Sequence, residues 1–124
     1  MNIGLVAHDG KKLDLINWVN YNKEILEHHI LYGTGTTARR ITENTGLIVN
    51  AYHSGPLGGD MEIGAKICNK ELDILVFFSD PLESHPHAVD VNALMRIATL
   101  YNIPTARNKS TADYLITSEL FNKK

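Results

Sequence analysis

The sequence lacks several features that would point to particular classes of protein. It has one cysteine, Cys68, so no disulfide can form within the chain, which suits a reducing cytoplasm. Its 12 basic residues do not outnumber its 14 acidic ones, and this balance argues against a binder of nucleic acid or of anionic membranes. No apolar stretch approaches the roughly 20 residues of a membrane span. The N-terminus lacks a basic region and a long apolar run, so we expect no signal peptide.

The composition is nevertheless sufficient for one hydrophobic core. Apolar residues make up 44% of the 124 residues, so we expect residues 1–124 to form a single domain. Cys68, in the segment AKICNK, is expected to be a small buried residue rather than a nucleophile. Small anionic substrates remain compatible with the net charge of −2, because they need only a local positive site.

Short apolar runs alternate with segments that suit helices. The runs of strand length are 3–7, 30–32, 47–49, 74–78 and, more weakly, 103–106. Five segments between or after these runs suit helices. Three of them have apolar residues at roughly helical spacing: Leu15, Trp18, Val19 and Leu26 in the first, Met61, Ala65 and Cys68 in the third, and Val91, Leu94, Ala98 and Tyr101 in the fourth. The second helix is expected at 36–44, with Gly46 marking its end, and the fifth at 111–118. This alternation predicts an α/β, Rossmann-like three-layer fold, with a five-stranded parallel sheet and helices on both faces. The run ILVFF at 74–78 is typical of a central strand buried on both sides.

Unusual residues follow the predicted strands at the ends where such folds bind ligands. HDG at 8–10 follows the first run, GTGTT at 33–37 the second and SGPLGGD at 54–60 the third. SDP and then HPH follow the fourth run, and RNK at 107–109 follows the fifth. Because the carboxyl ends of parallel strands meet at one edge of the sheet, we expect a site at that edge.

The GTGTT segment predicts either a phosphate site or a helix cap. Glycines such as Gly35 let backbone amides approach a ligand, and the positive end of a helix attracts phosphate. The hydroxyls of Thr34, Thr36 and Thr37 would add donors, but one threonine would equally cap the helix. The segment is neither a Walker loop nor GxGxxG, so no dinucleotide is indicated. Lys12 would either add positive charge or be a solvated helix residue.

Carboxylates and histidines at the same edge suit acid–base chemistry. Asp60 is either the N-cap of the next helix or a carboxylate base that faces the site. His8 lies next to Asp9, and His87 lies three residues before Asp90, which would orient its ring or cap a helix. No pair has the spacing of HExxH, so acid–base work is favoured over a metal. The remaining histidines are expected to face solvent: His28, His29, His53 and His85.

A base, a histidine polariser and a phosphate cradle together suit one type of reaction. That reaction is the abstraction of a proton next to a carbonyl in a phosphorylated sugar or triose, through an enediolate that nearby donors stabilise. Triosephosphate isomerase assembles the same roles with a Glu base and a neutral His.

Six motifs together resemble the methylglyoxal synthase family. They are LVAHD at 5–9, YGTGTT at 32–37, SGPLGGD at 54–60, FFSDPL at 77–82, PHAVDV at 86–91 and IPTARNKSTAD at 103–113. The resemblance runs from about residue 3 to residue 122. It implies a lyase that converts dihydroxyacetone phosphate to methylglyoxal and inorganic phosphate without metal or organic cofactor. It also implies a cytoplasmic homohexamer of Rossmann-like domains.

The resemblance implies a role for each matching residue. Asp60 corresponds to the catalytic base, His8 and His87 to the groups that contact the carbonyl and enediolate oxygens, and Asp9 and Asp90 to supporting carboxylates. The residues that correspond to the phosphate grip are Lys12, Thr34, Gly35, Thr36, Thr37, Ser54 and Gly55. The implied partners are dihydroxyacetone phosphate and phosphate, the latter as product and inhibitor, with no nucleic acid and no membrane. Longer members carry a later arginine for a neighbouring subunit's phosphate, and the last arginine here is Arg107.

Two other protein classes share the predicted fold. The chain also resembles the regulatory domain of carbamoyl phosphate synthetase, which binds effectors and does no chemistry. That alternative accounts for GTGTT but gives no joint role to Asp60, His87 and Asp90. A response-regulator receiver needs an aspartate at the end of the third strand, where this sequence reads NAYH at 50–53, so we set it aside.

Overall fold

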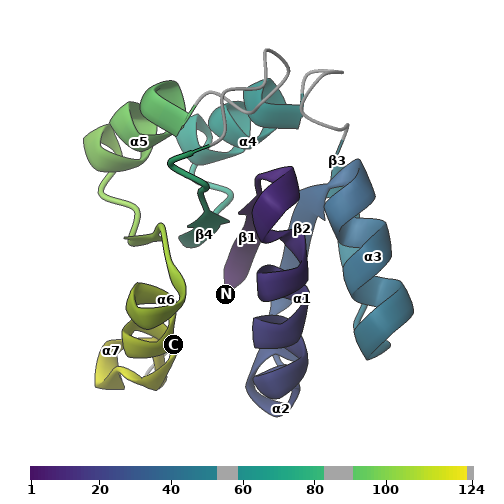
Figure 1. Ribbon diagram of the computed structural model, residues 1–124. Helices are drawn as coiled ribbons and strands as arrows, with labels where there is room; N and C mark the ends of the chain where they lie inside the picture. The colour runs from purple at the N-terminus through teal and green to yellow at the C-terminus, as the bar shows by residue number, and fades with distance from the viewer. Residues whose placement is uncertain (53–58, 83–90, 123–124) are drawn as a thin grey trace.

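A computed structural model describes residues 1–52, 59–82 and 91–122, with the backbone alone at 59, 60 and 122 (Figure 1). One sheet of five parallel strands has the order β3-β2-β1-β4-β5. The strands are β1 Asn2–Ala7, β2 Ile30–Thr34, β3 Val49–Tyr52, β4 Ile74–Phe78 and β5 Thr105–Ala106. The N-terminal strand therefore lies in the middle, because the chain adds β2 and β3 on one side of it and β4 and β5 on the other. The predicted parallel sheet is confirmed.

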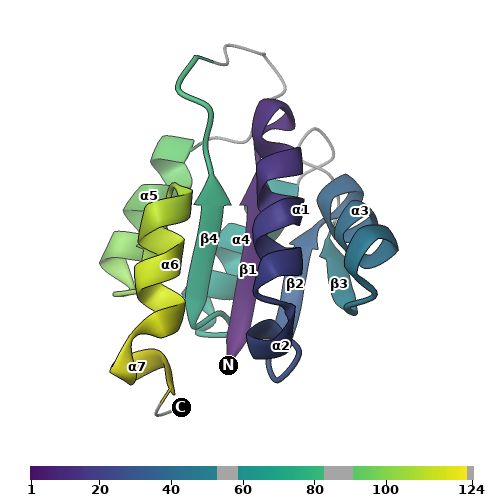
Figure 2. The same cartoon turned by 60° about the horizontal axis from the view of Figure 1, so that its bottom comes forward.

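Helices cover both faces of this sheet (Figure 2). They are the short 3-10 helix η1 Asp9–Lys11, followed by α1 Lys12–Tyr21, α2 Lys23–Leu26, α3 Gly35–Thr45, α4 Gly59–Cys68, α5 Val91–Leu100, α6 Lys109–Thr117 and α7 Glu119–Asn122. One core cluster joins α1, α3 and α6 to one face, and a second joins α4 and α5 to the other. The three layers expected from the sequence are present. No helix in the described ranges is long and apolar enough to cross a membrane.

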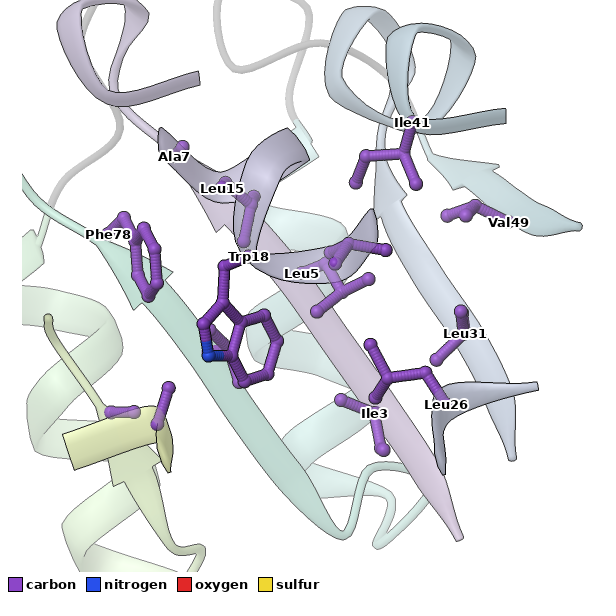
Figure 3. Packing of buried hydrophobic residues seen from close by; sticks show 14 of the residues in the cluster. Ile3, Leu5, Ala7, Leu15, Trp18, Leu26, Leu31, Ile41, Val49 and Phe78 are labelled. Carbon is purple, nitrogen blue, oxygen red and sulfur yellow. The ribbon is translucent and has the colours of Figure 1, made fainter. Parts of the chain in front are cut away.

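Strand β4 shows how the alternation of side chains builds both cores. All five of its residues are buried. Val76 and Phe78 belong to the cluster under α1, whereas Leu75 and Phe77 belong to the cluster under α4 and α5. Figure 3 shows Trp18 of α1 close to Phe78, with ring centroids 6.0 Å apart. The prediction of a central strand buried on both sides is confirmed.

Several element bounds differ from the prediction, for example the strand expected at 103–106, which is Thr105–Ala106, and contacts explain two further differences. The strand expected at 47–49 is instead Val49–Tyr52. Its bounds are set by pairing with β2, from Val49 opposite Leu31 to Tyr52 opposite Thr34, and not by the position of its apolar residues. The first predicted helix is two helices. The chain turns at Asn22, whose side-chain amide donates to the carbonyl of Trp18 at 2.9 Å and so occupies the end of α1.

The buried face of α4 was predicted wrongly. Ile63 and Ile67 are 1% and 0% exposed, whereas Met61 is 76% exposed and Cys68 is exposed. Both sets have helical spacing, but the two isoleucines bury more apolar area, so they face the sheet. Cys68 is therefore not the small core residue that its sequence suggested.

His29 also departs from the expectation of a solvent-facing ring. It is partly buried, its ring centroid lies 4.8 Å from that of Phe121, and its Nδ1 lies 3.0 Å from the Met1 amine. Burial, and then the nearby positive amine, lower the pKa of His29. His28 is exposed as expected, whereas residues 53 and 85 lie outside the described ranges.

Candidate active site

The segment GTGTT forms the end of β2 and the start of α3. Thr34 is the last residue of the strand and the N-cap of the helix, with an extended backbone and no side-chain cap hydrogen bond. The first turn of α3 contains no acidic residue. The sequence left open that one of the threonines caps the helix with its hydroxyl, and Thr34, at the N-cap, does not do so. The positive end of the α3 dipole lies at the carboxyl edge of the sheet without a side-chain cap.

Thr37 is a buried polar residue in this first turn. It is 0% exposed, and its Oγ1 has no hydrogen-bond partner in the part of the chain that the structure describes. A buried hydroxyl without a partner costs about 1–3 kcal/mol, so such groups are rare unless a ligand or water satisfies them. Thr34 is 5% exposed, and Gly35 and Thr36 are partly exposed. The segment thus combines a helix terminus with buried hydroxyl groups.

Gly33 allows β2 to approach β1 closely at this point. A Cβ on Gly33 would lie 3.0 Å from the backbone oxygen of Leu5, the residue with which it is paired. Any larger residue would push the two strands apart just before the start of α3. Gly33 therefore helps to set the position of the GTGTT segment.

Lys12 forms an ion pair with Asp9 rather than being a solvated surface lysine. Its Nζ lies 2.8 Å from Asp9 Oδ1, and its side chain is only 15% exposed, compared with 77% for Asp9. The two residues lie just after β1, one in η1 and one at the start of α1. A largely buried cation, paired with Asp9, is therefore held at the carboxyl edge of the sheet, beside the central strand.

His8 is buried at the end of β1 and is fixed by contacts to the end of β4. It is 7% exposed, and its backbone amide donates to the Phe78 carbonyl at 3.2 Å. The ring packs edge-on against Phe77, with centroids 5.2 Å apart. Its Nδ1 accepts a hydrogen bond from the backbone amide of Asp80 at 2.8 Å. The ring therefore lies where the chain order of the sheet reverses, the usual location of ligands in open α/β sheets.

Asp80 belongs to this arrangement, although the sequence assigned it no role. Its Oδ1 accepts from the Leu82 amide at 3.0 Å, and a Cβ on Gly10 would lie 2.7 Å from its Oδ2. Asp80 is thus in contact with both sides of the β1–β4 junction. The signal for this residue was its place after a buried strand, but only the strand order shows that this strand is the neighbour of β1.

Several predicted site residues lie outside the described residues. Ser54, Gly55, His87 and Asp90 fall in the undescribed ranges 53–58 and 83–90. Asp60 is the second residue of α4, so its backbone begins that helix, but its side chain is not described. Among the described residues, no three His, Cys, Asp or Glu side chains are grouped in a way that would hold a metal ion.

A cavity of about 1170 Å³ lies beside this set of residues, on the α1 and α6 side of the sheet. Its lining includes Lys11, Trp18, Phe78, Arg107 and Lys109, and no predicted substrate residue whose side chain the structure describes. Both lysines have carboxylate neighbours, with Nζ–Oδ2 distances of 3.9 Å from Lys11 to Asp14 and 3.0 Å from Lys109 to Asp113. The RNK segment thus lines a wall of mixed charge next to the candidate site.

Comparison with known proteins decides the family. A family model described as the MGS-like domain matches residues 14–107. Methylglyoxal synthase from Leptospira interrogans is 59% identical over 121 residues, which are 98% of this chain and 82% of that protein. The chain belongs to the methylglyoxal synthase family.

Other members of the methylglyoxal synthase family agree with this assignment. The methylglyoxal synthase of Coxiella burnetii is 56% identical over 119 residues, covering 96% of this chain and 83% of that protein. The crystal structure of methylglyoxal synthase from Elizabethkingia anophelis superposes with a TM-score of 0.94 at 43% identity, covering 97% of this chain and 79% of that one. The resemblance predicted from six short motifs is confirmed, and so is the fold.

Proposed function

We propose that this protein converts dihydroxyacetone phosphate to methylglyoxal and inorganic phosphate, and is therefore a carbon–oxygen lyase. Its relatives are named for the synthesis of methylglyoxal. The observation in this chain that carries the proposal is the start of α3. There a helix terminus without a side-chain cap adjoins the buried Thr37 hydroxyl, which has no partner among the described residues. A bound phosphate would satisfy both the dipole and the hydroxyl.

The chemistry needs a base first and a controlled departure of phosphate second. Removal of a proton from the hydroxymethyl carbon of dihydroxyacetone phosphate gives an enediolate. Loss of phosphate from the carbon that carries it then gives the enol of methylglyoxal. That enol becomes methylglyoxal by losing its hydroxyl proton and gaining one on the methylene carbon. Phosphate leaves when its C–O bond stands nearly perpendicular to the enediolate plane, because the π electrons then enter that bond. Fixing this geometry draws on the roughly 7–11 kcal/mol that orientation can supply.

The roles proposed at the reacting carbons are those that the resemblance to the family implies. Asp60, in the first turn of α4, is the proposed base. His8, held at the β1–β4 junction, and His87 donate hydrogen bonds to the carbonyl and enediolate oxygens. Asp9 and Asp90 are the supporting carboxylates, and the 2.8 Å contact of Asp9 with a lysine supports this role for Asp9. These assignments require donors aimed at the oxygen that becomes negative during the reaction.

The phosphate is proposed to lie between α3 and the start of α1. The residues that hold it are Lys12, Thr34, Gly35, Thr36, Thr37, Ser54 and Gly55. The low exposure of the Lys12 side chain supports this role, because a shielded ammonium attracts a phosphate more strongly than a solvated one. The same site would bind free inorganic phosphate, which is therefore expected to inhibit competitively.

The setting of the reaction is also part of the proposal. Residues 1–124 are proposed to form one domain, and the core cluster that Ile3 and Phe121 share supports this. The protein acts in the cytoplasm, for which its single cysteine is suited. It assembles as a homohexamer, and exposed apolar side chains such as Ile48 and Leu100, 82% and 76% exposed, offer surface for subunit contacts. Light scattering after gel filtration tests the assembly, and a monomer at working concentration would contradict it.

The activity is tested by mixing the purified protein with dihydroxyacetone phosphate and following methylglyoxal in a glyoxalase-coupled assay. We expect product well above the spontaneous background, and inorganic phosphate should raise KM without changing kcat. Absence of product above background would overturn the proposed function.

Asp60→Asn separates the base from the rest of the site. This variant keeps the size of the side chain but not its basicity, so kcat should fall at least 100-fold, within the range of a lost general base, about 10²–10⁴. Competitive inhibition by phosphate and the melting temperature should stay close to those of the wild type. An unchanged kcat would remove Asp60 from the role of base.

A further inference from the structure

The contact between the His8 ring and the Asp80 backbone carries an inference about proton location. A backbone N–H can only donate, so the ring nitrogen that receives it, Nδ1 at 2.8 Å, must carry a lone pair and no proton. A flipped ring would place a carbon opposite this amide and leave the donor unsatisfied. A doubly protonated ring would set two N–H groups against each other. The contact therefore specifies one of the three forms of the imidazole.

We propose that the Asp80 amide holds His8 as the neutral tautomer with its proton on Nε2, so that His8 acts on the substrate as a hydrogen-bond donor and not as a base. The proposal rests on the proposed function only for the last step, the action on the substrate. A neutral ring is a suitable donor to an enediolate oxygen, because it stabilises the charge without transferring its proton in the ground state. Asp80 is then a positioning residue for His8.

The surroundings hold both partners in the required place. The backbone of His8 is fixed twice, by its amide on the Phe78 carbonyl at 3.2 Å and by its carbonyl, which accepts from the Lys11 amide at 2.9 Å. Phe77 packs edge-on against the ring. His8 is only 7% exposed as a whole residue, so water does not readily compete for Nδ1. The tautomer is thus set by two strand ends whose relative position the sheet determines.

The side chain of Asp80 controls the direction of its own amide. Its Oδ1 accepts from the Leu82 amide at 3.0 Å, which closes a tight turn directly after β4. On the other side Gly10 leaves room for the carboxylate, since a Cβ there would lie 2.7 Å from Oδ2. Without the side-chain oxygen this turn would be less restrained, and the backbone amide of Asp80 would no longer be held in the direction of His8 Nδ1. Asparagine retains an oxygen in the same place, whereas alanine does not.

The test is a long-range ¹H–¹⁵N correlation spectrum of the full chain with ¹⁵N-labelled histidine, recorded at pH 7.5 without substrate. The His8 signals are assigned as those missing from His8→Gln. We expect the pattern of a single neutral tautomer, with the proton on Nε2 and Nδ1 bare. A proton on Nδ1, or a doubly protonated ring at this pH, would overturn the proposal. Because no substrate is present, this outcome is independent of whether the protein makes methylglyoxal.

A pair of Asp80 variants tests the positioning role. Asp80→Asn should keep the Nε2 tautomer, because its side-chain oxygen still accepts from Leu82, whereas Asp80→Ala should give a mixture of tautomers. In Asp80→Ala we expect kcat to fall by about tenfold or more, toward the 10²–10³-fold loss typical of one missing oxyanion donor, with KM within twofold. Gly64→Ala in α4, whose Cβ would lie 3.3 Å from the end of the Ile97 side chain and 3.9 Å from that of Leu94, is the control and should leave the tautomer unchanged. A single Nε2 tautomer in Asp80→Ala would overturn the part assigned to Asp80's side chain.

Discussion

The buried hydroxyl of Thr37 leads to a prediction with two opposite effects. Thr37→Val replaces the hydroxyl by a methyl group of nearly the same shape at a site that is 0% exposed. The wild-type Oγ1 has no partner among the described residues, so its removal should stabilise the protein in the absence of phosphate. The same hydroxyl is proposed to donate to the substrate phosphate, so its removal should weaken binding. One substitution should therefore raise stability and lower affinity.

The magnitudes follow from the energetics of hydrogen bonds. Removal of an unsatisfied buried hydroxyl should raise the free energy of unfolding by about 1 kcal/mol, the lower end of the penalty for such groups. For a chain of this size that gain corresponds to a rise in melting temperature of roughly 3–6 °C. A lost hydrogen bond to a charged phosphate is worth about 1.5–3 kcal/mol, which makes the inhibition constant of phosphate roughly 10- to 150-fold higher.

Thr45→Val in the same helix is the matched control. Thr45 is also buried, at 4% exposure, but its Oγ1 donates to the Ile41 carbonyl at 2.7 Å and accepts from the Leu47 amide at 3.2 Å. This variant should lose about 1–3 kcal/mol of stability, because it leaves the Leu47 amide without a hydrogen-bond acceptor. Its inhibition by phosphate should not change. Thermal melts in phosphate-free buffer and phosphate inhibition of the coupled assay measure both effects. If Thr37→Val behaves like Thr45→Val, less stable and with normal phosphate inhibition, the Thr37 hydroxyl is not an unsatisfied donor to phosphate.

Two further predictions concern stability alone. Tyr52→Phe should keep the free energy of unfolding unchanged or raise it by up to about 1 kcal/mol in urea titrations, because the buried Tyr52 hydroxyl has no partner in the described ranges. Burial, and then the nearby Tyr32, raise the pKa of Tyr52 to about 12. A clear loss of stability in this variant would contradict this account. His29 has a pKa below its usual 6.5, so its contribution to stability is full above that pH and is lost as the pH falls below it. Unfolding free energies at pH 7.5 and 5.5 should therefore differ less in His29→Gln than in the wild type, and an equal difference would argue against the lowered pKa.

The parts of the fold that the sequence predicted well are those with strong local signals. The run 74–78 is β4 to the residue, because five consecutive apolar side chains rich in Val, Ile and Phe suit a strand that is buried on both faces of a sheet. The end of the helix before Gly46 was predicted from glycine alone, and Gly46 indeed has the left-handed φ of 79° that ends helices. The GTGTT segment was likewise placed correctly at a strand end and a helix start.

The predictions that were wrong concern features that depend on contacts between distant residues, which no local sequence pattern contains. The stripe of Met61 and Cys68 has the same helical period as that of Ile63 and Ile67, so spacing could not choose between them, and the packing against β4 and α5 did. The bounds of β3 are set by its pairing with β2 rather than by its own residues.

The position of Asp80 beside His8 was out of reach for the same reason. The two residues are 72 positions apart in the chain. Alternation of strands and helices predicts a parallel sheet but not the order of its strands, and this contact exists only because β4 pairs with β1. The start of α3, by contrast, is encoded by five consecutive residues, so its affinity for phosphate could be proposed from those residues alone.

The central place of β1 has a consequence for how the protein is made. Of the five strands of this sheet, the central strand β1 is synthesised first, and one of its two neighbours, β4, begins only at Ile74. At synthesis rates of about 5–20 residues per second, β1 waits roughly 3–13 s for that neighbour, with one edge open to wrong pairings. His8, directly after β1, can accept its hydrogen bond from the Asp80 amide only after β4 has been synthesised. Assembly of the candidate active site is therefore tied to one late, long-range step of folding, and any chain released before about residue 80 cannot form it.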